Sequence, residues 1–278
     1  MHVFLAGATG VLGRRIVPRL LADGHRVTAL VRDDAGAAAV EAAGATPARA
    51  DAFDAGALAR AVAGAAPDAV MHQLTDLARG DSSANAHMRR TGTRNLVDAA
   101  KAAGVRRVVA QSIAWVYEPG PGPADEATPL DLGAAPPRRT TVEGVAALET
   151  AVRELPEWVV LRYGLLYGPD TWYTPGGLMA AKAKAGELVA GGDVSSFVHV
   201  DDAADAAVRA LGWPSGPVNV CDDEPLAARE WLPAFCRAVG APPPPASDAP
   251  RDGAARGASN RYARERLGWT PAHPVFSP

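Results

Sequence analysis

Three glycines near the start of the chain have the spacing of a phosphate-binding turn. Gly7, Gly10 and Gly13 form the pattern G-x-x-G-x-x-G, directly after an apolar run and directly before a helical pattern. Residues without a β-carbon let backbone N–H groups approach a pyrophosphate at the N-terminus of the following helix. The same spacing occurs in tight turns that bind nothing, and the strand–turn–helix context is what favours a dinucleotide site. The residues that we expect to contact the dinucleotide here are Gly7, Thr9, Gly10, Val11, Leu12 and Gly13.

The residue that ends the second apolar run indicates which dinucleotide is preferred. An acidic side chain at this position accepts hydrogen bonds from the ribose 2′-OH, whereas an arginine favours a 2′-phosphate. Arg32 occupies the position, although Asp33 and Asp34 follow and a shift of one residue would place a carboxylate there. The alternative role for Arg32 is a solvated loop charge. We expect NADP as the cofactor, with NAD less favoured.

Short apolar runs alternate with helical stretches along the first half of the chain. The segment Val11–Ala22 repeats apolar residues at helical spacing, and Pro18 inside it is expected to kink the helix. Nearly continuous apolar runs are typical of parallel strands covered on both faces. The pattern therefore predicts an α/β fold with a doubly wound parallel sheet. The predicted strands are Val3–Ala6, Val27–Val31, Ala69–His72, Val108–Gln111, Trp158–Arg162 and Phe197–Val200.

The periodicity stops at Glu118–Pro137, which is too rich in proline and glycine to hold regular structure. A loop of that length in a compact domain is usually functional or mobile. We expect residues 1–160 to form a Rossmann core, and residues 161–278 to form mainly a smaller substrate-side lobe with parts returning to the sheet.

Composition excludes several classes of function. The 278 residues carry a net charge of −3, which provides no basic field for nucleic acid or for an anionic membrane. The two cysteines are too few for a disulfide framework or a zinc cluster. We interpret His199, Asp201 and Asp202 as a strand end and a helix start rather than as metal ligands. With no secretion signal and no membrane-length apolar run, we expect a cytoplasmic protein that acts on a small molecule, and we leave a homo-oligomer open.

The same residues resemble the extended short-chain dehydrogenase/reductase family, also called the NAD-dependent epimerase/dehydratase family, over nearly the whole chain. Besides GATGVLG, the similar segments are the pair Asp51-Ala52, the run Thr91–Leu96, the segment Arg162–Pro169 and the motif Phe197–Asp202. The resemblance implies that Asp51 and Ala52 hold the adenine. The further residues that it places at the cofactor are Leu74, Gln111, Tyr163, Gly164 and Leu165.

The family's catalytic residues do not match. Family members use a Ser/Thr together with Tyr-x-x-x-Lys, and the corresponding positions here are Ile113, Thr141 and Val145. Ser112 is one residue away from the Ser/Thr position. No tyrosine in the chain stands four residues before a lysine. Ser112 and His72 are the candidates for a substitute, and the catalytic residues are otherwise unknown. The residues that we expect to contact substrate are Ile113, Thr141, Trp172 and Tyr173.

Three functions are compatible with this pattern. We expect an NADPH-dependent oxidoreductase, most concretely a ketoreductase of secondary metabolism acting on a small or aromatic polyketide-like ketone. A phenol hydrogen-bonded to such a ketone would polarise it without help from the protein. The second is a non-catalytic NADP-binding sensor or regulatory protein. The third is a sugar-nucleotide epimerase or dehydratase. The missing tyrosine and lysine weaken this hypothesis most, because the first step of those reactions removes a hydroxyl proton.

Overall fold

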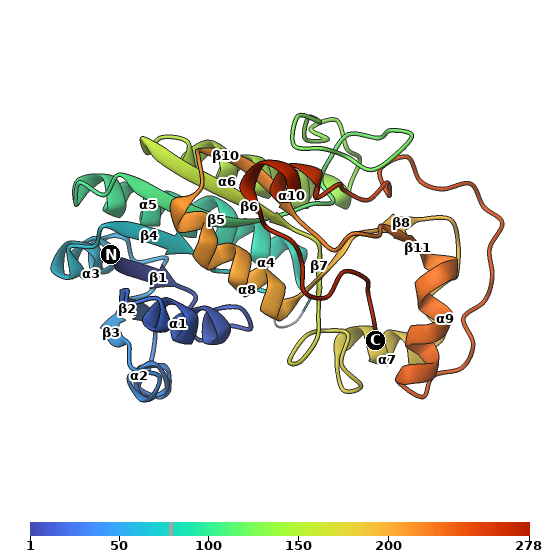
Figure 1. Cartoon of the computed structure of the whole chain (residues 1–278), viewed down its shortest axis with the longest axis horizontal. Coiled ribbons are helices and arrows are strands. Elements are labelled where there is room, and N and C mark those ends of the chain that lie inside the picture. The colour runs from blue at the N-terminus through green and yellow to red at the C-terminus, as the bar shows by residue number, and fades with distance from the viewer. Residues whose placement is uncertain (78–79) are drawn as a thin grey trace. The chain divides into compact units, whose positions relative to one another are not determined.

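The computed structural model describes residues 1–77 and 80–278. A seven-stranded sheet has the strand order β10-β6-β5-β4-β1-β2-β3 (Figure 1). The pairings of β1 with β2 and β4, of β2 with β3, and of β4 with β5 are parallel. The predicted α/β class with a doubly wound parallel sheet is confirmed. The strands are β1 (His2–Ala6), β2 (Arg26–Val31), β3 (Thr46–Arg49), β4 (Ala69–His72), β5 (Arg107–Ile113), β6 (Glu157–Tyr163) and β10 (Gly216–Val220).

Helices connect the parallel strands, because strands that run in the same direction need a long crossover connection. The first helix begins at Gly13, two residues later than its apolar pattern suggests, because Val11 and Leu12 belong to the glycine turn, and it continues through Pro18. A π-helical turn, Met88–Gly92, joins α4 to α5. The helices of this part are α1 (Gly13–Ala22), α2 (Asp34–Ala42), α3 (Ala55–Ala65), α4 (Ser82–His87), α5 (Thr93–Ala102), α6 (Arg138–Val152) and α8 (Val200–Arg209).

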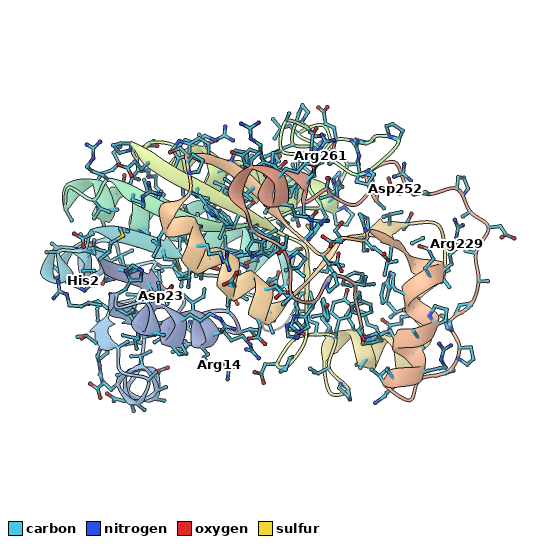
Figure 2. The ribbon with its side chains drawn as sticks, in the orientation of Figure 1. His2, Arg14, Asp23, Arg229, Asp252 and Arg261 are labelled. Carbon is cyan, nitrogen blue, oxygen red and sulfur yellow. The ribbon has the colours of Figure 1, made fainter. Side chains whose placement is uncertain are left out.

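The chain divides into two compact units. Unit 1 comprises Met1–Ser112, Leu132–Leu161 and Ala204–Pro217, and unit 2 comprises the remaining segments, Ile113–Asp131, Arg162–Ala203 and Val218–Pro278. Figure 2 shows the side chains that fill the spaces between the elements. Because side chains alternate along a strand, one face of the unit 1 sheet presents apolar residues to helices α3 and α5. The core on that face includes Phe4, Leu58, Val62, Val70 and Leu96.

Unit 2 is built around aromatic side chains. Its short strands pair as β7 (Leu165–Tyr167) with β9 (Phe197–His199), and as β8 (Val194–Ser195) with β11 (Leu226–Ala227). The core packs against α7 (Leu178–Lys184) and α9 (Ala228–Ala238). A last helix, α10 (Arg261–Leu267), follows near the C-terminus. The aromatic core residues are Tyr167, Tyr173, Phe197, Trp231, Phe235 and Phe276.

Two arginines hold the start of the long proline-rich loop. Arg251 donates to the carbonyl of Gly120 at 2.6 Å, and Arg256 donates to the carbonyl of Glu118 at 3.1 Å. These contacts satisfy backbone carbonyls that a loop without regular structure would otherwise leave to water. Among the described residues, no helix combines the length and the apolar character that a membrane span requires.

Candidate cofactor-binding site

The glycine turn in unit 1 has a geometry that only glycine permits at two of its positions. Gly7 has φ +99°, and a β-carbon there would lie 2.6 Å from the carbonyl oxygen of Gln73. A β-carbon at Gly13 would overlap the carbonyl oxygen of Gly7 and the backbone of Ala8. The N–H of Gly10 closes the turn on the carbonyl of Gly7 at 3.1 Å. The turn thus brings the strand end and the helix start so close together that side chains are excluded.

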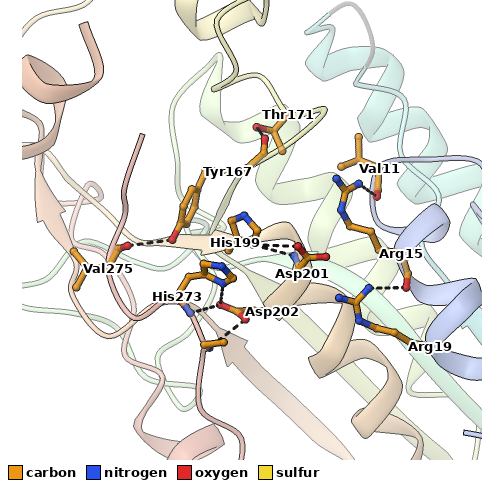
Figure 3. Close-up of polar contacts among 12 residues, drawn as sticks. Val11, Arg15, Arg19, Tyr167, Thr171, His199, Asp201, Asp202, His273 and Val275 are labelled. Carbon is orange, nitrogen blue, oxygen red and sulfur yellow. Dashed lines mark hydrogen bonds and ion pairs between the residues drawn. The ribbon is translucent and has the colours of Figure 1, made fainter. Parts of the chain in front are cut away.

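The N-terminus of α1 is not capped by a side chain of any described residue. Its N-cap residue is Leu12, which makes no side-chain hydrogen bond, and no acidic residue lies in the first turn. The side chain of Arg15 instead turns back to the carbonyl of Val11 at 2.9 Å (Figure 3). Uncapped N–H groups and the positive end of the helix dipole suit a phosphate. The sequence pattern and the local structure therefore indicate the same ligand.

Positive charge follows the end of β2. Asp33 caps α2, accepting from the N–H of Gly36 at 2.8 Å, and Asp34 pairs with Arg49. Both carboxylates that compete with Arg32 in the cofactor prediction are therefore engaged in local contacts. Arg32 is exposed and makes no hydrogen bond or ion pair with any other described residue.

The segment predicted to hold the adenine forms a turn that is held by hydrogen bonds. Asp51 accepts from the N–H of Phe53 at 2.9 Å, and Asn95 on α5 donates to the carbonyl of Ala52, also at 2.9 Å. The Phe53 ring is partly exposed and stacks on His87 with the ring centroids 4.7 Å apart. The motif Thr91–Leu96 thus supplies the asparagine that fixes this turn.

His72 is fully engaged within unit 1. One ring nitrogen lies 2.7 Å from the hydroxyl of Thr93, and the other accepts from the N–H of Leu74 at 3.2 Å. Burial, reinforced by the charge of Arg89, lowers the pKa of His72 to about 4. The imidazole is therefore neutral at pH 7, which suits a structural role. A proton-transfer role for His72 stays a prediction.

Ser112 points into the core of unit 1 rather than to a surface. It donates to Glu149 on α6 at 2.9 Å, and Glu149 also lies 3.5 Å from Arg153. Because successive strand residues face opposite sides, Ile113 points the other way, and it is buried. The hydroxyl of Ser112 is thus already used in a buried hydrogen bond.

Helix α6 carries the positions predicted to match the family's tyrosine and lysine. Thr141 is 9% exposed and Val145 is fully buried. Between them, a β-carbon at Gly144 would lie only 3.0 Å from the backbone of Ala86, so α6 packs tightly on α4. Thr141 is therefore the one polar group at these two positions.

The end of β6 and the residues directly after it belong to unit 2. Tyr163 is 1% exposed, and its hydroxyl lies 3.5 Å from the carbonyl of Ala203. A β-carbon at Gly164 would lie 2.8 Å from the backbone of Phe197, and Leu165 pairs with Phe197 in the β7–β9 ladder. Gln111 and Leu74, on unit 1, are buried and half-buried respectively.

The two predicted substrate aromatics differ in their surroundings. Tyr173 is 9% exposed and packs edge-to-face on Phe197 and Phe235, with ring centroids 5.4 and 5.5 Å away. Trp172 is 36% exposed. Of the pair, Trp172 alone presents an aromatic surface to solvent, and the role of both residues in binding substrate stays a prediction.

Unit 2 contains a buried polar network that was not predicted from the sequence. The hydroxyl of Tyr117 donates to Asn219 and accepts from Arg162 at 3.1 Å, while Glu126 accepts from the N–H of Asn219 at 2.8 Å. Burial raises the pKa values of both Tyr117 and Glu126. No periodic signal marks such a network, because Arg162 and Asn219 lie 45 and 102 residues along the chain from Tyr117.

The histidine and aspartates considered as metal ligands have other partners. His199 stacks on His273 with the ring centroids 3.8 Å apart, and Asp202 accepts from the N–H of His273 at 2.9 Å (Figure 3). Tyr167 donates to the carbonyl of Val275 at 3.1 Å. These contacts hold the C-terminal segment against β7, β9 and the start of α8 within unit 2. Among the described residues, no cluster of three or more histidine, cysteine, aspartate or glutamate side chains is arranged to hold a metal.

These features are typical of an NAD(P)-binding protein: a glycine turn joins a strand to a helix, the start of that helix is uncapped, and an arginine follows the second strand. The family model described as NAD(P)H-binding matches residues 7–212. The chain belongs to this family, and its resemblance to the extended short-chain dehydrogenase/reductases is confirmed by its relatives and structural neighbours.

Two curated relatives cover nearly the whole chain. One is a 3-diazoavenalumate denitrifying reductase of a Streptomyces species, 46% identical over 99% of this chain and 98% of the relative. The other is a UDP-glucose 4-epimerase of Mycolicibacterium smegmatis, 33% identical over 98% and 94%. Among solved structures, the UDP-glucose 4-epimerase of Thermus thermophilus in complex with NAD is 27% identical, with a TM-score of 0.73 over 98% and 94% of the two chains. These relatives support an enzyme of the oxidoreductase type.

Proposed function

We propose that the chain is an NADPH-dependent reductase that transfers hydride to a small electrophile without a Tyr/Lys proton relay. The observation that carries the proposal is the combination of two facts. The chain is 46% identical, over nearly its full length, to a relative named as a reductase of a diazo compound, and it contains no Tyr-x-x-x-Lys. The nucleotide turn supports hydride chemistry, and the missing relay restricts which electrophiles are suitable.

The residues of unit 1 fit the cofactor. The backbone of the glycine turn and the start of α1 would hold the pyrophosphate, Asp51 and Ala52 would hold the adenine, and Arg32 would pair with a 2′-phosphate. NADPH supplies a hydride when it is bound. The protein's contribution is then to bind, to orient and to exclude water, and orientation alone lowers a barrier by several kcal/mol.

The proton balance distinguishes two classes of substrate. Reduction of a ketone consumes a hydride and a proton, and a positioned acid usually contributes about 10²–10⁴-fold to the rate. Reduction of an arenediazonium ion consumes only the hydride: a C–H bond forms, the C–N bond breaks, and its electron pair leaves with neutral N₂. Because the diazonium group leaves as neutral N₂, no oxyanion develops on the substrate, and no donor is needed to stabilise one.

We therefore propose an arenediazonium carboxylate as the substrate class. The relative's name describes a diazo-bearing carboxylate and a denitrifying reduction, and that reaction needs none of the side chains that are replaced by Ile113, Thr141 and Val145. The ketoreductase function remains the second candidate, limited to ketones that carry an adjacent phenol. An epimerase is disfavoured, although one relative has that name, because epimerisation requires a base to take a hydroxyl proton.

The test is an assay of NADPH oxidation with a panel of arenediazonium carboxylates, with N₂ release followed by mass spectrometry. We expect one N₂ and one arene C–H for each NADPH consumed. A matched pair of aromatic ketones, one with a neighbouring hydroxyl and one with that hydroxyl methylated, tests the second candidate. Turnover of the ketones without any N₂ release would replace the diazo proposal, and tight NADPH binding without turnover of any compound would favour a sensor.

A further inference from the structure

Gln73 is a buried amide without partners, directly beside the nucleotide turn. The side chain is 5% exposed, and neither Oε1 nor Nε2 has a hydrogen-bond partner within the part of the chain that the structure describes. Most buried side-chain polar atoms in proteins are hydrogen-bonded, and leaving one unsatisfied costs about 1–3 kcal/mol. Gln73 has two such atoms on one side chain, which calls for an explanation at this position.

The position ties the amide to the pyrophosphate turn. The N–H of Gln73 donates to the carbonyl of Ala6 at 2.8 Å, which places it next to the last residue of β1. The carbonyl of Gln73 is the group that a β-carbon at Gly7 would strike at 2.6 Å. The residue therefore lies at the point where backbone N–H groups are expected to approach a phosphate.

The neighbouring residues do not use the amide. His72 precedes it and faces Thr93, so the Gln73 side chain projects to the other face of the strand end. His72 and Ala110 are partners in the β4–β5 ladder, so Gln111 follows at the level of Gln73. No hydrogen bond joins the two amides among the described residues, and Gln111 has no unsatisfied buried atom.

We propose that the Gln73 amide binds the cofactor where its pyrophosphate meets the nicotinamide-side ribose. A carboxamide offers two donor hydrogens and one acceptor oxygen. The donors suit a phosphate oxygen and the acceptor suits a ribose hydroxyl, so this junction satisfies both orphan atoms at once. The inference rests on the proposed use of NADPH but not on any particular substrate.

The test compares Gln73→Met, which keeps the shape and removes both polar atoms, with the unmodified protein. Dissociation constants are measured at a temperature at which circular dichroism shows both proteins to be fully folded. We expect NADPH and ADP-ribose to bind about tenfold more weakly to the variant. Binding of 2′,5′-ADP, which lacks the pyrophosphate and the second ribose, should not change. The melting temperature without cofactor should stay the same or rise, because a buried unsatisfied group has been removed.

Two further variants keep the result decisive. Gln73→Glu retains the size but adds a negative charge beside the pyrophosphate, so it should weaken ADP-ribose binding more than the methionine does. His2→Leu is the matched control. His2 also has an unsatisfied buried atom, but it lies at the first residue of β1, whereas Gln73 lies beside Ala6 at the other end of that strand. The His2→Leu variant should leave both constants unchanged. Unchanged ADP-ribose affinity in Gln73→Met, or an equal loss for 2′,5′-ADP, overturns the assignment. Because these assays contain no substrate, their result is independent of whether diazo compounds are reduced.

Discussion

The nucleotide turn and the family's catalytic positions differ in how completely their polar groups are satisfied. Around the turn, no described residue pairs with Arg32, satisfies the two amide atoms of Gln73 or caps the N-terminus of α1. At the positions predicted to match the family's catalytic residues, Ile113 and Val145 offer only apolar side chains, and the hydroxyl of the adjacent Ser112 is hydrogen-bonded to Glu149. The polar groups without a protein partner near the turn are available to a ligand, whereas the Ser112 hydroxyl is used within the protein.

The largest loss of NADPH affinity is expected when a side chain is added inside the glycine turn. Gly13→Ala places a β-carbon on the carbonyl of Gly7, so NADPH affinity should fall about a thousandfold, or about 4 kcal/mol. Gly64→Ala on α3, where a β-carbon meets no described atom within 4 Å, is the control and should bind normally. Fluorescence titration of NADPH measures both. If NADPH bound to Gly13→Ala with near-normal affinity, the glycine turn would not be the site that holds the cofactor.

The next effect concerns His72 and acid. Its pKa of about 4 in the folded state lies below the ordinary 6.5, so the unfolded chain takes up the proton more readily between those values. Stability should therefore fall as the pH drops from 6.5 to 4, by up to about 3 kcal/mol. Urea unfolding across this range should show a shallower fall for His72→Gln. A variant that keeps the acid sensitivity but loses turnover would place His72 in catalysis instead.

A smaller effect tests the charge of Arg32, directly after β2, with which no other described residue pairs. NADPH should bind about tenfold more tightly than NADH, equivalent to 1.4 kcal/mol, because Arg32 can pair with the 2′-phosphate. Arg32→Asp should erase or reverse this preference. Equal affinities of the unmodified protein for both cofactors would contradict the NADP assignment.

The smallest effect on turnover is expected at Thr141, which is predicted to match the family's tyrosine. Thr141→Val should change turnover by less than about tenfold, well below the 10²–10⁴-fold that removal of a general acid costs. The variant keeps the shape of the side chain, so single-turnover rates isolate the hydroxyl. A loss in the full range would show that Thr141 has taken over the proton-donor role.

The sequence predicts local features well and long-range ones poorly. Strand Ala69–His72 can be delimited from its apolar run, and the helix predicted over Val11–Ala22 is correct to within two residues, because strands and helices are periodic. Strand β3 (Thr46–Arg49) has no apolar run that would reveal it, since it is a half-exposed edge strand. The link between Tyr117 and Asn219 depends on tertiary packing, as do the unsatisfied atoms of Gln73. Neither of these has a sequence signature.

The central claim is that hydride reaches the substrate without a proton from the protein, and a reaction in D₂O tests it most directly. With unlabelled NADPH and an arenediazonium carboxylate, the new arene C–H should carry protium from the cofactor, and the single-turnover rate should be the same in H₂O and D₂O. It should also stay flat between about pH 6 and 8, because no general acid titrates. Deuterium in the arene, or a solvent isotope effect of about twofold or more with a rate that falls as the pH rises, would contradict the account.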